Sequence, residues 1–117
     1  QWVKSVAGNY ERSIGEINYI FCSDEKILEV NNQYLQHDYY TDIITFDYTT
    51  GHIISGDIYI SLDTITTNAE QFATSFNDEL HRVIIHGILH LCGLKDETEE
   101  EEAEMRRAED EALVLLP

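Results

Sequence analysis

Two histidines, His86 and His90, lie four residues apart in an apolar stretch of the sequence. Residues i and i+4 of an α-helix project from one face, about one turn apart, so both imidazoles can reach one metal ion. Gly93 follows, and glycine commonly ends a helix, so that Asp96 can return a carboxylate to the same ion. Two histidines and a carboxylate leave the fourth position of a tetrahedral zinc site open for water. We therefore predict one Zn2+ per chain, held by His86, His90 and Asp96.

The same spacing has two other interpretations. Metzincin proteases share it, but they carry a glutamate base directly after the first histidine, and that position holds Gly87 here. A pair of histidines on an apolar helix is also common in cores that bind no metal. His81, five residues before His86, is expected on another face, at the surface or behind the ligands. His37 and His52 have no partner pattern and are left out of the metal site.

The remaining sequence predicts the elements that position these residues. Apolar alternation and helical periodicity divide the chain into a helix over residues 2–13, an extended segment over 14–22, a helix from 24 to about 34, two strands over 42–49 and 52–61, and helices ending near 76, 93 and 115. Thr50-Gly51 marks a turn between the two strands, which we expect to pair. Ser61 or Asp63 is expected to cap the next helix. Strands and helices are largely segregated, which indicates an α+β fold in a single domain spanning 1–117.

The charge of the chain bears on its partners. There are 23 Asp and Glu residues against 7 Lys and Arg, a net charge of −16, and ten of the acids fall within 96–117. Such a chain repels nucleic acid unless a local site overrides the field. We expect the last helix to present a solvated acidic face, and the alternative is that this face docks on a basic protein partner.

Location is predicted from cysteine usage and from the lack of long apolar runs. Cys22 and Cys92 both lie in apolar segments and are expected as buried hydrophobic residues of a reducing compartment. No stretch of the sequence reaches the apolar length of a membrane helix. The expectation is a cytoplasmic protein with no membrane partner.

Three motifs in order resemble the YbeY family of bacterial endoribonucleases, over about residues 17–115. They are His86-Gly-x-Leu-His90-Leu-x-Gly93, the pair Asn31-x-x-Tyr34 and Thr41-Asp42-Ile-Ile-Thr45-Phe46, and Gly56-Asp57-Ile58-x-Ile60-Ser61. The resemblance implies a small mixed sheet flanked by helices, with the metal on a central helix that starts near Asp78. It also implies a single metal-dependent hydrolase domain. The implied activity is zinc-dependent, single-strand-specific cleavage of ribosomal RNA, at the 3′ end of the small-subunit RNA and on defective ribosomes, with RNA and the ribosome as partners rather than DNA.

The chain departs from this family at several positions. Asp96 stands where the family has a third histidine, and a carboxylate is an acceptable zinc ligand. Leu35 replaces a basic residue, normally arginine, whose guanidinium would stabilise phosphoryl charge. Lys95, beside Asp96, is a candidate to supply that positive charge. Thr45 replaces a serine and keeps its hydroxyl, although threonine is also a common strand residue.

Two points stay open. Asp57 and Glu79 are candidates for a general base by residue type alone. Leu35 and the charge of −16 favour a second hypothesis, a ribosome-associated metal-binding factor with little nuclease activity.

Overall fold

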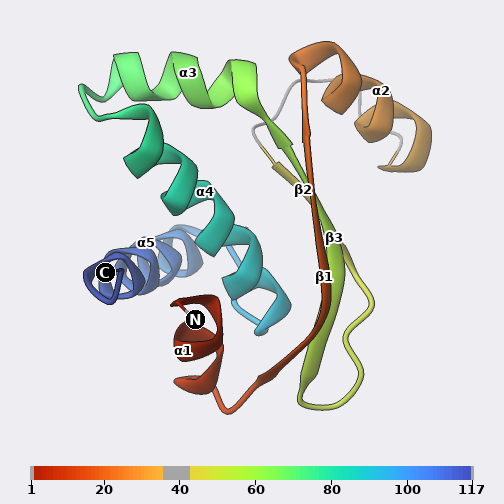
Figure 1. The fold of residues 1–117 in the computed structure, drawn as a ribbon, viewed down its shortest axis with the longest axis vertical. Helices are drawn as coiled ribbons and strands as arrows, with labels where there is room; N and C mark the ends of the chain where they lie inside the picture. Colours follow the sequence, from red (N-terminus) through yellow and green to blue (C-terminus); the bar gives the residue numbers. More distant parts are fainter. Residues whose placement is uncertain (1, 36–42, 117) are drawn as a thin grey trace.

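A computed structural model describes residues 2–35 and 43–116, with residues 33–35 described through their backbone only (Figure 1). Five helices and three strands follow one another in the described residues. In chain order they are α1 (Trp2–Gly8), β1 (Ser13–Cys22), α2 (Asp24–Leu35), β2 (Ile43–Asp47), β3 (Ile53–Ser61), α3 (Leu62–Gln71), α4 (Phe76–Leu91) and α5 (Glu99–Val114). The α+β class is confirmed.

The three strands form one mixed sheet in the order β1-β3-β2. β2 and β3 pair antiparallel, as the turn at Thr50-Gly51 predicted, and Gly51 has the positive φ of 62° that this turn requires. β1 runs parallel to β3, with Tyr19 opposite Ile58. The central strand is therefore β3, which is flanked on both edges.

Helix α4 is the central helix and packs directly on the sheet (Figure 1). Its buried residues Val83, Ile85, Ile88 and Leu89 join the main core with apolar residues of β3. Gly87 lies where the helix comes closest, since a Cβ added there would stand 3.0 Å from the Ile43 Cδ1 atom and 3.1 Å from the Ile58 Cδ1 atom. The residue next to the first histidine is therefore small because the sheet is close.

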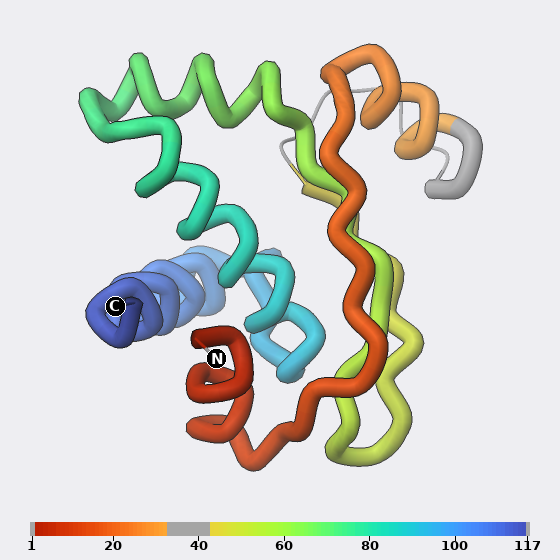
Figure 2. The backbone as a smooth tube through the Cα atoms, viewed as in Figure 1, coloured from red at the N-terminus to blue at the C-terminus, as the bar shows by residue number. Residues whose placement is uncertain are grey.

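Helix α5 lies on the other side of α4 from the sheet, and Figure 2 shows the chain turning back after α4 to form it. A capping box starts α5, in which the side chains of Thr98 and Glu101 satisfy backbone N–H groups reciprocally. Its buried stripe is Met105, Ala108, Glu109 and Ala112. These residues hold α5 against α4, so α4 lies between two layers.

Several helix boundaries differ from the prediction. Helix α1 ends at Gly8 rather than near 13, because a turn follows in which Glu11 adopts a φ of 60°. Ser61 is confirmed as the N-cap of α3, but α3 ends at Gln71 and Ala73 adopts a φ of 53°. Helix α4 then begins at Phe76, capped by the Ser75 hydroxyl. Among the described residues, no helix has the length and apolar character needed to cross a membrane.

Candidate metal centre

Helix α4 and the loop after it bring the three residues predicted as ligands together. His86 and His90 lie one turn apart, and their Nε2 atoms are 3.1 Å from each other. Gly93 ends the helix region with a φ of 106°, and its N–H donates to the His90 carbonyl. The loop then returns Asp96, whose Oδ2 atom lies 3.3 Å from the His86 Nε2 atom and 3.4 Å from the His90 Nε2 atom. The three residues could hold a metal ion.

The spacing of these three atoms fits tetrahedral coordination. Zinc–ligand bonds of about 2.0–2.1 Å place neighbouring ligand atoms of a tetrahedron about 3.3–3.4 Å apart. The observed separations of 3.1, 3.3 and 3.4 Å lie at or close to this value. The side chains need little movement to accept an ion.

The hydrogen bonds of the two rings assign their tautomers. The His90 Nδ1 atom lies 3.0 Å from the Leu94 carbonyl oxygen, which can only accept, so this nitrogen carries the proton. The His86 Nδ1 atom lies 2.6 Å from the Glu109 Oε2 atom and likewise donates to it. When the two rings are neutral, both Nε2 lone pairs face each other and the Asp96 carboxylate. Three electron-rich atoms in contact repel one another without a cation, so the donor set fits a bound metal.

Glu109 contacts the potential ligand His86, and the sequence analysis did not single it out. It is 5% exposed, and its Oε1 atom accepts from the Arg82 Nη1 atom at 2.8 Å. Burial raises the pKa of Glu109, but hydrogen bonds from His86 and Arg82 outweigh this and hold the pKa below its ordinary value. The side chain therefore stays ionised, and it orients His86 as carboxylates behind metal-bound histidines do.

The other predicted histidines lie elsewhere. His81, expected at the surface or behind the ligands, is partly buried and packs edge-on against Trp2 of α1, with ring centroids 5.6 Å apart. His52 is exposed next to Gly51 in the turn before β3. His37 lies outside the described residues, as do Thr41 and Asp42 of the second motif, and the side chains of Tyr34 and Leu35 are likewise not described.

The remaining candidate residues occupy different surroundings. The Asp57 Oδ1 atom accepts from the Asn18 amide at 3.0 Å, across β3 and β1. Glu79 is buried on α4 and lines a pocket that also reaches His86. Lys95 is exposed and lines a separate hollow with Glu104 and other residues of α5, and none of the three potential ligands lines that hollow.

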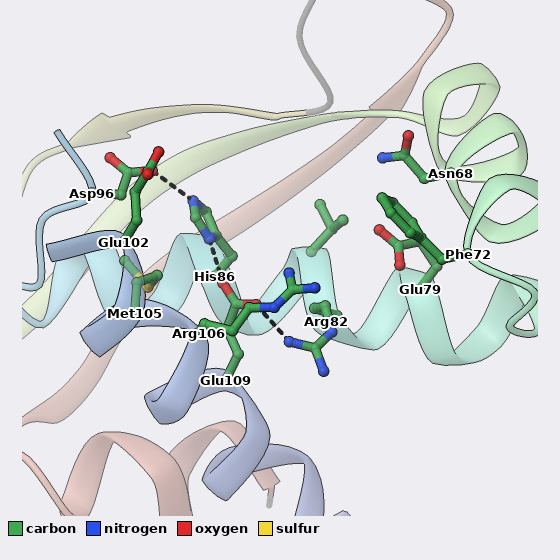
Figure 3. A pocket seen from close by; sticks show the side chains of 11 residues that line it. Asn68, Phe72, Glu79, Arg82, His86, Asp96, Glu102, Met105, Arg106 and Glu109 are labelled. Atoms are coloured by element: carbon green, nitrogen blue, oxygen red, sulfur yellow. Dashed lines mark hydrogen bonds and ion pairs between the residues drawn. The ribbon is translucent and has the colours of Figure 1, made fainter. Parts of the chain in front are cut away.

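The pocket beside the potential ligands has a volume of about 400 Å3 and lies between α3, α4 and α5 (Figure 3). His86 and Asp96 lie at one end of it, and Phe72 and Asn68 lie at the other. Its size is that of a site for a small molecule or one nucleotide. The metal group therefore opens onto a space that a substrate can enter.

The fold and the site define a small α+β protein with a His/His/Asp group that could hold a metal ion on its central helix. The sequence profile of the family described as Endoribonuclease YbeY matches residues 1–116. This chain belongs to that family, and the resemblance noted from the three motifs is confirmed.

Proteins of known sequence and structure agree with this assignment. Endoribonuclease YbeY of Bacteroides thetaiotaomicron is 66% identical over 115 residues, which are 98% of this chain and 84% of that protein. Endoribonuclease YbeY of Flavobacterium psychrophilum is 54% identical over 115 residues, which are 98% of this chain and 82% of that protein. The solution structure of a Thermotoga maritima protein matches with a TM-score of 0.65 and 28% identity, covering 97% of this chain and 77% of the other.

Proposed function

We propose that this chain is a zinc-dependent endoribonuclease that cleaves single-stranded RNA, with the metal held by His86, His90 and Asp96. The observation that carries the proposal is the convergence of three acceptor atoms within 3.4 Å, with both Nδ1 protons already committed to other acceptors. The family name supplies the reaction, and the chain belongs to that family. When bound, zinc supplies a Lewis acid that activates water and polarises a phosphoryl oxygen.

The residues of the chain have distinct roles in this reaction. His86 and His90 provide neutral nitrogen ligands, and Asp96 provides one negative charge. Glu109 holds the His86 ring in the orientation and tautomer that present its Nε2 atom. Arg82 in turn fixes Glu109.

A proton acceptor is needed for the attacking water, and Glu102 is our candidate. Glu109 is already held by His86 and Arg82, and Asp96 faces both ligand histidines. Glu102 is exposed on α5 and lines the pocket, and Figure 3 shows its side chain directed toward Asp96. We prefer it to Glu79, which is buried farther along the pocket.

The physiological substrate that we propose is ribosomal RNA, at the 3′ end of the small-subunit RNA and in ribosome quality control, in the cytoplasm. The charge of −16 disfavours tight binding of naked RNA, but this repulsion is screened beyond about 8 Å at physiological salt. The acidic face of α5 could also dock on a basic ribosomal protein. The same charge supports one alternative, a ribosome-associated metal-binding factor with little nuclease activity.

Cleavage of single-stranded and duplex RNA of the same sequence tests the proposal. We expect zinc-loaded protein to cut the single strand, to lose this activity with chelator and to regain it with zinc. A His86→Ala, His90→Ala variant should be folded and inactive. Binding of zinc with no cleavage of any RNA would favour the alternative factor. Unchanged cleavage after Lys95→Ala would exclude Lys95 as the cation that replaces the family arginine.

A further inference from the structure

We propose that the pocket next to the metal group binds one nucleotide of the single-stranded RNA, with Arg106 contacting a backbone phosphate and Phe72 stacking on the base. This inference rests on the proposed nuclease function and adds the residues that hold the substrate. Neither residue was singled out by the sequence analysis. Both line the pocket of about 400 Å3 that His86 and Asp96 also line.

Arg106 is the uncommitted positive charge in this pocket. Arg82, the other arginine that lines it, is held by Glu109 at 2.8 Å and by Asp110 at 2.6 Å. Within the described residues, the guanidinium of Arg106 makes no hydrogen bond and no ion pair, although the side chain is exposed on a strongly acidic helix. A free guanidinium presents several N–H donors to phosphate oxygens in a planar fork.

Helix geometry directs Arg106 toward the metal group. Arg106 lies three residues before Glu109, and residues at this spacing share one face of a helix. Glu109 contacts His86 at 2.6 Å, so this face of α5 is turned to the metal group. Figure 3 shows Arg106 between His86 at one end of the pocket and Phe72 at the other. An RNA strand whose scissile phosphate lies at the metal group can therefore place a neighbouring phosphate near Arg106.

Phe72 gives the pocket an aromatic wall at its far end. It is 60% exposed at the C-cap of α3, where a solvent-facing phenyl ring adds little to the core. Asn68, one helical turn earlier, lines the same pocket with an amide that can both donate to and accept from a base edge. Proteins recognise single-stranded RNA by stacking unpaired bases on exposed aromatic rings. A duplex keeps its bases stacked inside, so a site built this way selects single strands.

The pocket continues away from the metal group. A second hollow, of about 560 Å3, shares Phe72, Glu79, Arg82 and Arg106 with the first and extends to Leu116 near the end of α5. The two hollows form one path that begins at the metal group and passes Arg106 and Phe72. RNA nucleotides on one side of the cut would follow this path away from the metal group.

Binding of a labelled single-stranded oligonucleotide, 2′-O-methylated so that it resists cleavage, tests the inference by fluorescence anisotropy on zinc-loaded protein. Arg107→Ala is the matched control for Arg106→Ala, because Arg107 pairs with Glu104 and lines a different hollow. Phe21→Leu is the control for Phe72→Leu, because Phe21 is also exposed, at 48%, and lies on β1.

We expect Arg106→Ala and Phe72→Leu each to weaken binding about fivefold or more and to raise KM, with zinc content unchanged. Arg106→Ala should also reduce the slope of the logarithm of the binding constant against the logarithm of the salt concentration. The expected reduction is about 0.7 in magnitude, the value of one phosphate contact on a single strand. Both controls should stay within about twofold of the wild type. Equal affinities for Arg106→Ala and Arg107→Ala, with the wild-type protein cleaving RNA, would overturn the subsite and leave the nuclease proposal standing. A wild-type protein that neither binds nor cleaves RNA would overturn both.

Discussion

Replacing Glu109 by glutamine removes one negative charge behind the metal group and changes little else in size. In the wild type, this carboxylate accepts from the His86 Nδ1 atom at 2.6 Å and from the Arg82 Nη1 atom at 2.8 Å. The glutamine carbonyl can still accept one of these hydrogen bonds, but it no longer makes His86 more basic. We therefore expect Glu109→Gln to fold and to bind zinc more weakly.

The size of this effect follows from the position of the residue. Carboxylates that orient metal-bound histidines contribute about 10- to 100-fold to metal affinity, which corresponds to about 1.4–2.7 kcal/mol. Glu109 is 5% exposed, so solvent does not replace the lost interaction. Folding stability should fall less, by about 1–2 kcal/mol, because hydrogen bonds to charged groups contribute about 1.5–3 kcal/mol and Arg82 keeps Asp110 as a second partner.

Zinc competition with a chromophoric chelator measures the change. Asp110→Asn is the matched control, since it removes the negative charge of the other partner of the same guanidinium, and the hydrogen bond from the His86 Nδ1 atom goes to Glu109. We expect the zinc dissociation constant to rise about 10- to 100-fold for Glu109→Gln and less than about threefold for Asp110→Asn. Equal zinc affinity for Glu109→Gln and the wild type would refute the role assigned to this carboxylate.

Three further predictions concern the loop, the cap and the ion. Gly93→Ala places a side chain on a residue with a φ of 106°, so the free energy of unfolding measured by denaturant titration should fall by about 1–3 kcal/mol. Zinc binding should also weaken, because Asp96 moves with this loop. A free energy of unfolding equal to that of the wild type would contradict this. Thr98→Ala removes the N-cap of α5 and should lower stability by about 1 kcal/mol, whereas the nearby exposed Glu100→Ala should not. Zinc at 100 times its dissociation constant should stabilise the protein by about 2.7 kcal/mol. This should appear as a rise in Tm in the wild type and should be absent in the His90→Ala variant. An equal rise in the two proteins would mean that the ion binds elsewhere.

The potential ligands could be found from the sequence because local geometry determines where they lie. The i, i+4 rule places His86 and His90 on one face, and a glycine stop followed by a short loop returns Asp96. All three atoms then meet within 3.4 Å. No long-range contact had to be known for this part of the site.

Glu109 could not be found in the same way, because it lies 23 residues from His86 and reaches it through the packing of α5 on α4. In the sequence it belongs to an acidic segment that suggests a solvated face. One signal was present: Glu109 lies four residues after Met105 and three before Ala112, so it shares the helix face that is buried. An acid on an apolar stripe is unusual, and a buried partner explains it.

The parallel pairing of β1 with β3 could likewise not be predicted from the local sequence pattern. Alternation predicted a strand near residues 14–22, but the order β1-β3-β2 depends on pairing between distant residues, such as Tyr19 of β1 with Ile58 of β3. The early end of α3 at Gln71 had no Gly or Pro to mark it, and Ala73 adopts a φ of 53° there. This turn matters for function because it exposes Phe72 at the pocket.

Titrating metal-free protein with zinc while measuring the cleavage rate of a single-stranded RNA tests the central claim most directly. The account predicts that the rate rises from near zero and reaches a plateau at one zinc per chain, and that His86→Ala, His90→Ala protein stays inactive throughout. Full cleavage by protein shown to contain no metal would contradict a metal-dependent nuclease centred on His86, His90 and Asp96.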